Sequence, residues 1–232
     1  MAFSDIRGVI LDLDGTLIDS MSIWHEIDIA FFAENGLTLP EGLSETVAKM
    51  SIDEWAAYFV QNYVPSLTEA QVISRIEEMA AEHYRNTIPM KPYVTEFLDL
   101  LDARRIPYGI CTATYRSSAG AVLTRLGLLP RMQFVLTGED FPAGKSTPEM
   151  YLAAQQRLGF PVRNILVVED ALHCVEMAVR TGFPVAAVYD PTIPDAEWNR
   201  VCELATVHGE GLRDIVTFFR PDGRLGGASR PS

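Results

Sequence analysis

A short stretch near the start of the chain, residues 8–19, constrains the fold more than any other. It begins with a continuous apolar run, residues 9–11, which is typical of a strand buried on both faces of a parallel sheet. The run ends in two carboxylates, Asp12 and Asp14, separated by one leucine. If strand geometry persists that far, both carboxylates point to the same side, because strand positions two apart share a face.

This pair of acids indicates a function rather than a structural role. Two carboxylates held so close repel each other, and one tends to stay protonated unless a cation or hydrogen-bond donors intervene. Mg²⁺ takes carboxylates, substrate phosphates and waters as ligands. In open α/β sheets, ligands bind beyond the carboxyl ends of the strands. The pair therefore predicts a Mg²⁺ site with a carboxylate nucleophile beside a general acid.

The composition is that of an ordinary globular chain, with 232 residues of which 48% are hydrophobic. The net charge of -12 argues against nucleic acid as the main partner, because binding a phosphate backbone requires basic patches. The three cysteines are scattered, the start does not resemble a signal peptide, and no apolar stretch approaches the roughly 18 residues of a membrane span. We therefore expect a cytoplasmic protein without a membrane partner. The sequence does not indicate the oligomeric state, and a monomer is compatible with it.

Residues 20–90 predict a small helical domain of three helices. Gly36 and Pro65 are placed to end the first and second helices, and Ser51 and Thr68 begin capping-box patterns. The predicted apolar faces contain Ile23, Ile27, Ala30 and Phe31 in the first helix, Trp55, Tyr58 and Phe59 in the second, and Val72, Ile76, Met79 and Ala80 in the third.

From Lys91 onward, helices alternate with apolar strands, which predicts a parallel sheet with right-handed crossovers. We expect residues 1–19 and 91–219 to form the core domain and the Gly-, Pro- and Ser-rich tail 220–232 to be disordered. The strands predicted after the first are 108–112, 134–137, 165–168 and 185–188. The predicted helices are 95–104, 117–126, 148–158, 171–180, 195–206 and 212–219.

Two of these later strands end in polar residues. The strand 108–112 ends in Thr112, and its hydroxyl, with the backbone N–H groups of Ala113 and Thr114, suits phosphate oxygens as well as simple turn chemistry. The strand 165–168 ends in Glu169 and Asp170, although Asp170 alone also suits the N-cap of the next helix. Both ends are predicted at the same edge of the sheet as the first acid pair.

Four stretches, in this order, resemble the four motifs of the haloacid dehalogenase (HAD) superfamily. They are D-x-D-G-T from Asp12, the strand that ends in Thr112, the G-K-x-x-P run around Lys145, and the strand that ends in Glu169 and Asp170. Lys145 alone has the pattern of a solvated charge, and only the resemblance gives it a role. The chain resembles the phosphoglycolate phosphatase and β-phosphoglucomutase-like group. This implies an α/β fold with a Rossmann-like core, a parallel sheet flanked by helices, and a helical cap domain, residues 20–90, inserted after the first strand.

The resemblance also implies a role for each motif residue. Asp12 attacks phosphorus and forms an aspartyl-phosphate, and Asp14 protonates the leaving oxygen and later activates water. Mg²⁺ is held by Asp12, by the backbone carbonyl of Asp14 and by Asp170. Glu169 is either a further metal ligand or an acid behind the ligands.

The remaining motif residues are expected to bind the transferring phosphoryl group. Thr112 and Lys145 hold it, together with the backbone N–H groups of Ala113 and Thr114. In this superfamily, dehalogenases lack an acid at the position of Asp14, so its presence favours phosphoryl transfer. We therefore expect a Mg²⁺-dependent phosphatase that acts on a small phosphorylated metabolite.

Two alternatives remain open. The first is a phosphosugar mutase, which would have an arginine near Ile52 and a histidine at the position of Trp24, so these two residues disfavour it. His25 lies one residue from the expected histidine and is either a substrate contact or a residue on the surface of a helix. A binding protein on the same scaffold is disfavoured because every catalytic position is filled. Specificity is expected to lie in the cap domain, and the candidate substrate contacts are Trp24, His25, Lys49 and Met50.

Overall fold

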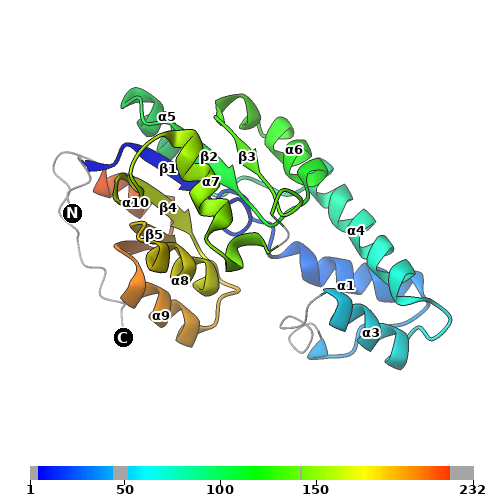
Figure 1. Ribbon diagram of the computed structural model, residues 1–232. Coiled ribbons are helices and arrows are strands. Elements are labelled where there is room, and N and C mark those ends of the chain that lie inside the picture. Colours follow the sequence, from blue (N-terminus) through cyan, green and yellow to red (C-terminus); the bar gives the residue numbers. More distant parts are fainter. Residues whose placement is uncertain (1–4, 44–51, 142, 220–232) are drawn as a thin grey trace. The chain divides into compact units, whose positions relative to one another are not determined.

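The computed structural model describes residues 5–43, 52–141 and 143–219 (Figure 1). The chain divides into two compact units. The core unit consists of Met1–Asp19 and Pro89–Ser232, and the insert unit consists of Ser20–Ile88. The predictions for Ser51 and for the tail 220–232 concern residues outside the described ranges.

The described part of the core unit contains a parallel sheet of six strands in the order β3-β2-β1-β4-β5-β6. The chain builds one half of the sheet outward from β1 and then returns to begin the other half at β4. Ligands bind at such a switch point in open α/β sheets, beyond the carboxyl ends of the strands. The strands are β1 (Gly8–Leu11), β2 (Tyr108–Cys111), β3 (Val135–Leu136), β4 (Ile165–Glu169), β5 (Val185–Val188) and β6 (Val207–Gly209).

Helices cover both faces of this sheet (Figure 1). Ile10 packs in a buried cluster with apolar residues of α7, α8 and α9, so these three helices cover the face to which Ile10 points. On the other face α10 packs against α5 and against β5 and β6. The helices are α5 (Val94–Ala103), α6 (Arg116–Arg125), α7 (Glu149–Leu158), α8 (Leu172–Thr181), α9 (Asp195–Leu204) and α10 (Leu212–Phe218), with short 3-10 turns η2 (Leu129–Arg131), η3 (Gly144–Ser146) and η4 (Val162–Asn164).

The predicted α/β fold is confirmed, and the predicted strands and helices of the core unit are present with ends displaced by at most two residues. The strand β6 was not predicted. It is a three-residue strand at the edge of the sheet in which only Val207 is buried. Such a strand has no apolar run from which sequence could identify it.

The insert unit is helical in its described part, with α1 (Ile23–Glu34), α3 (Ile52–Asn62) and α4 (Glu69–Asn86). Its core is aromatic: the rings of Phe32 and Phe59 meet edge-on with centroids 5.2 Å apart, and Trp55 meets Phe59 at 4.0 Å. The predicted capping box at Thr68 is present. The predicted apolar positions are buried apart from Ala30 and Tyr58, which are partly exposed.

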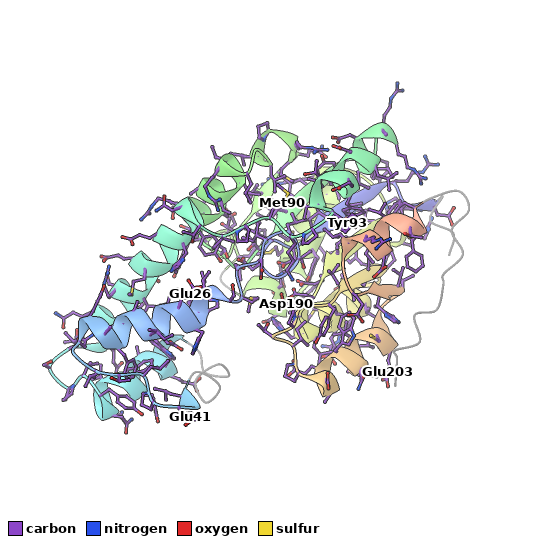
Figure 2. All side chains as sticks on the ribbon, turned by 180° about the vertical axis from the view of Figure 1, so that it is seen from behind. Glu26, Glu41, Met90, Tyr93, Asp190 and Glu203 are labelled. Atoms are coloured by element: carbon purple, nitrogen blue, oxygen red, sulfur yellow. The ribbon has the colours of Figure 1, made fainter. Side chains whose placement is uncertain are left out.

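The surface of the insert unit carries charged side chains such as Glu26 and Glu41, which Figure 2 labels. No helix among the described residues of either unit has both the length and the apolar character that a membrane span needs.

Candidate active site

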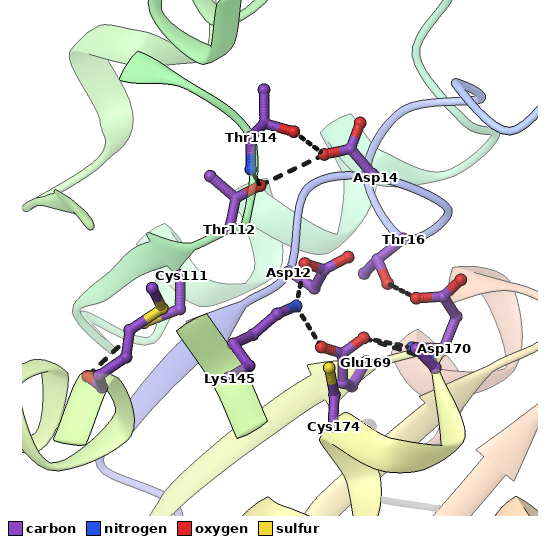
Figure 3. Close-up of polar contacts among 12 residues, drawn as sticks. Asp12, Asp14, Thr16, Cys111, Thr112, Thr114, Lys145, Glu169, Asp170 and Cys174 are labelled. Carbon is purple, nitrogen blue, oxygen red and sulfur yellow. Dashed lines mark hydrogen bonds and ion pairs between the residues drawn. The ribbon is translucent and has the colours of Figure 1, made fainter. Parts of the chain in front are cut away.

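Asp12 is the first residue after β1, and it lies at the carboxyl edge of the sheet. Its backbone N–H donates to the Val168 carbonyl at 3.0 Å, so the residue remains in register with β4. Its side chain is buried, and the ammonium of Lys145 contacts its Oδ1. Lys145 is carried by the η3 turn and is itself buried (Figure 3). A carboxylate and an ammonium from residues 133 positions apart thus form a buried ion pair.

Glu169 holds Lys145 from the other side. Its Oε1 contacts the Lys145 ammonium, and its Oε2 accepts the backbone N–H groups of Asp170 at 2.8 Å and Ala171 at 3.3 Å. Burial raises the pKa of Glu169, but the charge of Lys145 and these hydrogen bonds lower it by more, so the pKa lies below its ordinary value. Glu169 is therefore an ionised group whose two oxygens both have partners within the protein.

Asp170 completes a buried group of three acids. Oxygens of Asp12, Glu169 and Asp170 all lie within 4.8 Å of one another. The Thr16 hydroxyl donates to Asp170 Oδ1 at 3.4 Å. Gly15 has a φ of +77°, and a Cβ at this position would lie 2.2 Å from Asp170 Oδ2. The glycine of the D-x-D-G-T stretch is therefore required both for the turn and for the space that Asp170 occupies.

Two of these carboxylates are unfavourable as anions in the metal-free protein. Burial, and then the charge of Glu169, raise the pKa of Asp12 to about 8. Burial, followed by the charges of Glu169 and Asp12, raises the pKa of Asp170 well above its ordinary value. A divalent cation reverses this situation because it favours the charged form of each acid. Closely spaced carboxylate oxygens are also the ligands that Mg²⁺ prefers, so these residues fit that ion.

Asp14 lies beside this group and turns to the loop after β2. The hydroxyls of Thr112 and Thr114 donate to its Oδ2 at 3.2 Å and 2.6 Å (Figure 3). The Thr114 backbone N–H donates to the Thr112 hydroxyl at 3.1 Å. The prediction that both carboxylates share a face assumed that strand geometry persists to Asp14. β1 ends at Leu11, although the Asp12 backbone N–H still bonds to β4, so this condition holds only in part and the shared face stays a prediction.

The structure therefore brings the predicted residues of the core unit to one edge of the sheet, in two neighbouring groups. Ala113 lies between the two threonines and is exposed. The predicted substrate contacts in the insert unit stay predictions. Trp24 and His25 are exposed on α1, which belongs to the insert unit, whereas Lys49 and Met50 lie outside the described residues.

Sequence reasoning missed a second, partly buried ion pair at the same edge of the sheet. Asp190 follows β5 by two residues, and its Oδ2 lies 2.5 Å from the Lys91 ammonium. Its Oδ1 accepts the hydroxyl and the backbone N–H of Thr192. Burial raises the pKa of Asp190, but the hydrogen bonds from Lys91 and Thr192 lower this pKa by more, so it lies below its ordinary value. An acid just after an apolar strand was the signal that could have identified it.

Comparisons with known proteins agree with this geometry. The chain matches the family model of haloacid dehalogenase-like hydrolases over residues 6–182. It is 28% identical to hexitol phosphatase A of Escherichia coli, over 94% of this chain and 96% of that protein. It is also 28% identical to a phosphoglycolate phosphatase of Yersinia pseudotuberculosis, over 78% and 80% of the two chains. Among solved structures, a putative beta-phosphoglucomutase from Thermotoga maritima has the same fold, with a TM-score of 0.81, 22% identity, and 91% and 97% of the two chains covered.

Proposed function

Because the chain belongs to the haloacid dehalogenase-like hydrolase family, we propose that it is a Mg²⁺-dependent phosphomonoesterase acting on a small phosphorylated metabolite. The observation that carries the proposal is the buried contact of Lys145 with Asp12, beside Asp170 and at the switch point of the sheet. A nucleophilic carboxylate, a fixed positive charge and a group of metal-binding oxygens are what phosphoryl transfer requires. Relatives named as phosphatases support the same class of reaction.

In the first step, an oxygen of Asp12 attacks the phosphorus of the bound ester. A bond forms between that oxygen and phosphorus, and the bond from phosphorus to the leaving oxygen breaks. Asp14 gives its proton to the leaving oxygen, and the alcohol departs. The product is an aspartyl-phosphate on Asp12.

In the second step, Asp14 takes a proton from a water molecule that attacks the same phosphorus. The bond between phosphorus and Asp12 breaks, inorganic phosphate leaves, and Asp14 is again protonated. Throughout, the Lys145 ammonium offsets negative charge on Asp12 and on the transferring group. The Thr112 hydroxyl and the backbone N–H of Ala113 hold phosphoryl oxygens, and the backbone N–H of Thr114, which donates to the Thr112 hydroxyl, supports them.

We assign the metal ligands to Asp12, Asp170 and the backbone carbonyl of Asp14. When bound, Mg²⁺ supplies positive charge to the phosphoryl oxygens. Glu169 remains a candidate ligand because its carboxylate lies in the same group. Its two oxygens already have Lys145 and backbone N–H groups as partners, so we assign it to the positioning of Lys145.

No observation on the described residues favours a phosphosugar mutase. Trp24 stands where that reading expects a histidine, and its side chain is exposed. The similarity to the solved beta-phosphoglucomutase-like structure concerns the fold. A binding protein without catalysis is disfavoured by the filled positions of Asp12, Asp14 and Lys145.

The decisive variant is Asp12→Asn, which keeps the size of the side chain and removes the nucleophile. We expect it to release no phosphate from para-nitrophenyl phosphate in the presence of Mg²⁺, while its circular dichroism matches that of the wild type. Asp190→Asn is the matched control, since Asp190 is also buried in an ion pair at the same edge of the sheet. It should retain turnover. Unchanged phosphate release by Asp12→Asn would disprove the proposal. If the wild type is active and the variant is not, a screen of phosphorylated metabolites would identify the substrate.

A further inference from the structure

The loop after β2 contains a hydroxyl that the proposed reaction does not use. Thr114 donates to Asp14 Oδ2 at 2.6 Å, which is shorter than the 3.2 Å bond from Thr112 to the same oxygen. Both residues belong to the core unit, and Thr114 is 100 positions from Asp14 in the chain. The acid that exchanges protons with the substrate is thus held by a hydroxyl from the loop after β2.

The two threonine hydroxyls cannot serve Asp14 equally during the reaction. Each hydroxyl has one proton to donate. The Thr112 oxygen accepts the Thr114 backbone N–H. The single hydroxyl proton of Thr112 can therefore be donated either to Asp14 or to a phosphoryl oxygen. When Thr112 donates to the phosphoryl group, as the proposed function requires, its bond to Asp14 is lost. The Thr114 hydroxyl then continues to hold Asp14.

The loop that carries Thr114 is fixed from the neighbouring strand. Glu139, just after β3, accepts the Arg116 backbone N–H at the start of α6 at 2.5 Å. Gly138 lies so close that a Cβ there would be 2.8 Å from the Ala113 carbonyl oxygen. The guanidinium of Arg116 also pairs with Asp140. These contacts hold the loop on both sides of Thr114, so its hydroxyl is presented from a fixed backbone.

We infer that Thr114 is a positioning residue that sets the orientation of Asp14 for proton transfer to the leaving oxygen. The inference rests on the proposed function. The hydrogen bond to Oδ2 fixes the plane of the carboxyl group, and therefore fixes where Oδ1 points. Because a general acid must lie within hydrogen-bond reach of the oxygen that it protonates, a loss of this orientation weakens the acid step in particular.

The test uses two aryl esters of similar size whose leaving oxygens differ in basicity. Para-nitrophenolate leaves readily without a proton, whereas the oxygen of phenyl phosphate depends more on a general acid. Thr114→Val replaces the hydroxyl with a methyl of similar size. We expect it to lower kcat/KM about tenfold for phenyl phosphate and less than about threefold for para-nitrophenyl phosphate, as a partial loss of the roughly 100-fold or larger contribution of a positioned acid.

Two further variants separate orientation from structure. Thr114→Ser retains the hydroxyl and should restore the wild-type ratio between the two esters. Thr124→Val is the matched control, because Thr124 lies on α6 and its hydroxyl donates to the Gly120 carbonyl. It should leave the ratio unchanged. If Thr114→Val does not fold, comparison of Thr114→Ala with Thr114→Ser gives the same contrast in the presence or absence of the hydroxyl.

The inference is overturned if Thr114→Val lowers kcat/KM equally for the two esters, or does not lower it at all, while the wild type is active. A wild type that releases phosphate from neither ester would overturn the proposed function, and the inference with it. The two failures are therefore distinguishable.

Discussion

The ion pairs that Lys145 forms at the carboxyl edge of the core sheet are buried, whereas the ion pairs described in the insert unit lie on the surface. The side chains of Lys145 and Glu169 are 8% and 1% exposed. In the insert unit, Arg75 and Glu34 pair with side chains that are 36% and 44% exposed. Buried charges cost free energy to desolvate, and exposed pairs contribute little. The comparison teaches that the core unit retains an arrangement that stability alone does not favour, which is typical of a catalytic site.

The two units also differ in the distance along the chain that their contacts cover. The Thr68 capping box joins residues three positions apart, whereas Lys145 contacts an acid 133 positions away. Local contacts of the first kind form within one helix. Contacts of the second kind depend on the strand order of the whole sheet. Variants in the two units should therefore differ in their effects on activity, and three predictions test this difference.

The largest effect is expected from Lys145→Met. This variant loses the positive charge that stabilises the transferring phosphoryl group. Removal of one such stabilising side chain costs roughly 100- to 1000-fold in kcat. It also leaves Asp12 and Glu169 buried together without a cation, and removal of one partner of a buried pair costs about 3–5 kcal/mol. Phosphate release and urea unfolding measure the two effects.

Lys91→Met is the matched control for this variant. The Lys91 side chain is 12% exposed and pairs with the buried Asp190, and neither residue belongs to the proposed catalytic groups. This variant should lose stability for the same reason but retain its kcat. If the two lysine variants lost kcat to the same extent, the effect of Lys145→Met would not be specific to the proposed catalytic groups.

An intermediate effect is expected from the removal of Mg²⁺, and it should depend on pH. The pKa of Asp12 is about 8 in the folded metal-free protein and 3.8 as a reference value. Between these values the folded state keeps a proton that the unfolded state releases. The free energy of unfolding without metal should therefore fall as pH rises through this window.

Mg²⁺ should oppose this fall because it binds the deprotonated carboxylates. At a concentration of 100 times Kd, a ligand of the folded state adds about 2.7 kcal/mol. Urea unfolding with EDTA or with Mg²⁺, at about pH 5 and about pH 8, measures the difference. Stabilisation by Mg²⁺ that was larger at the lower pH would contradict the assignment of the metal to these acids. Asp170→Asn should reduce the stabilisation.

The smallest effect is expected in the insert unit, from Thr68→Ala. The Thr68 hydroxyl accepts the Gln71 backbone N–H at the start of α4. Loss of such a cap costs about 1 kcal/mol. Thermal unfolding should record this loss, Thr68→Ser should reverse most of it, and kcat for para-nitrophenyl phosphate should not change. A large fall in kcat would show that the capping box serves catalysis, and the contrast between the units would fail.

Much of the fold could be predicted because its signals are short-range. Buried parallel strands such as β4 form continuous apolar runs, and helices such as α4 begin with recognisable caps. The strand β6 was missed because a short, half-exposed edge strand has no such run. The residues of the candidate site were predicted from their positions at strand ends and from the resemblance to a family. Their catalytic roles remain predictions.

The sequence by itself determined the α/β class, the helical insert and the acids that follow β1 and β4, because each is a local pattern of apolar and polar residues. Only the tertiary structure decided which side chains meet. Glu169 fixes Lys145 between two carboxylates, Asp170 leaves space only for a glycine at position 15, and Thr114 holds Asp14. The physical reason is that these contacts join residues up to 155 positions apart across neighbouring strands, and strand order and turn geometry, rather than local spacing, set their distances.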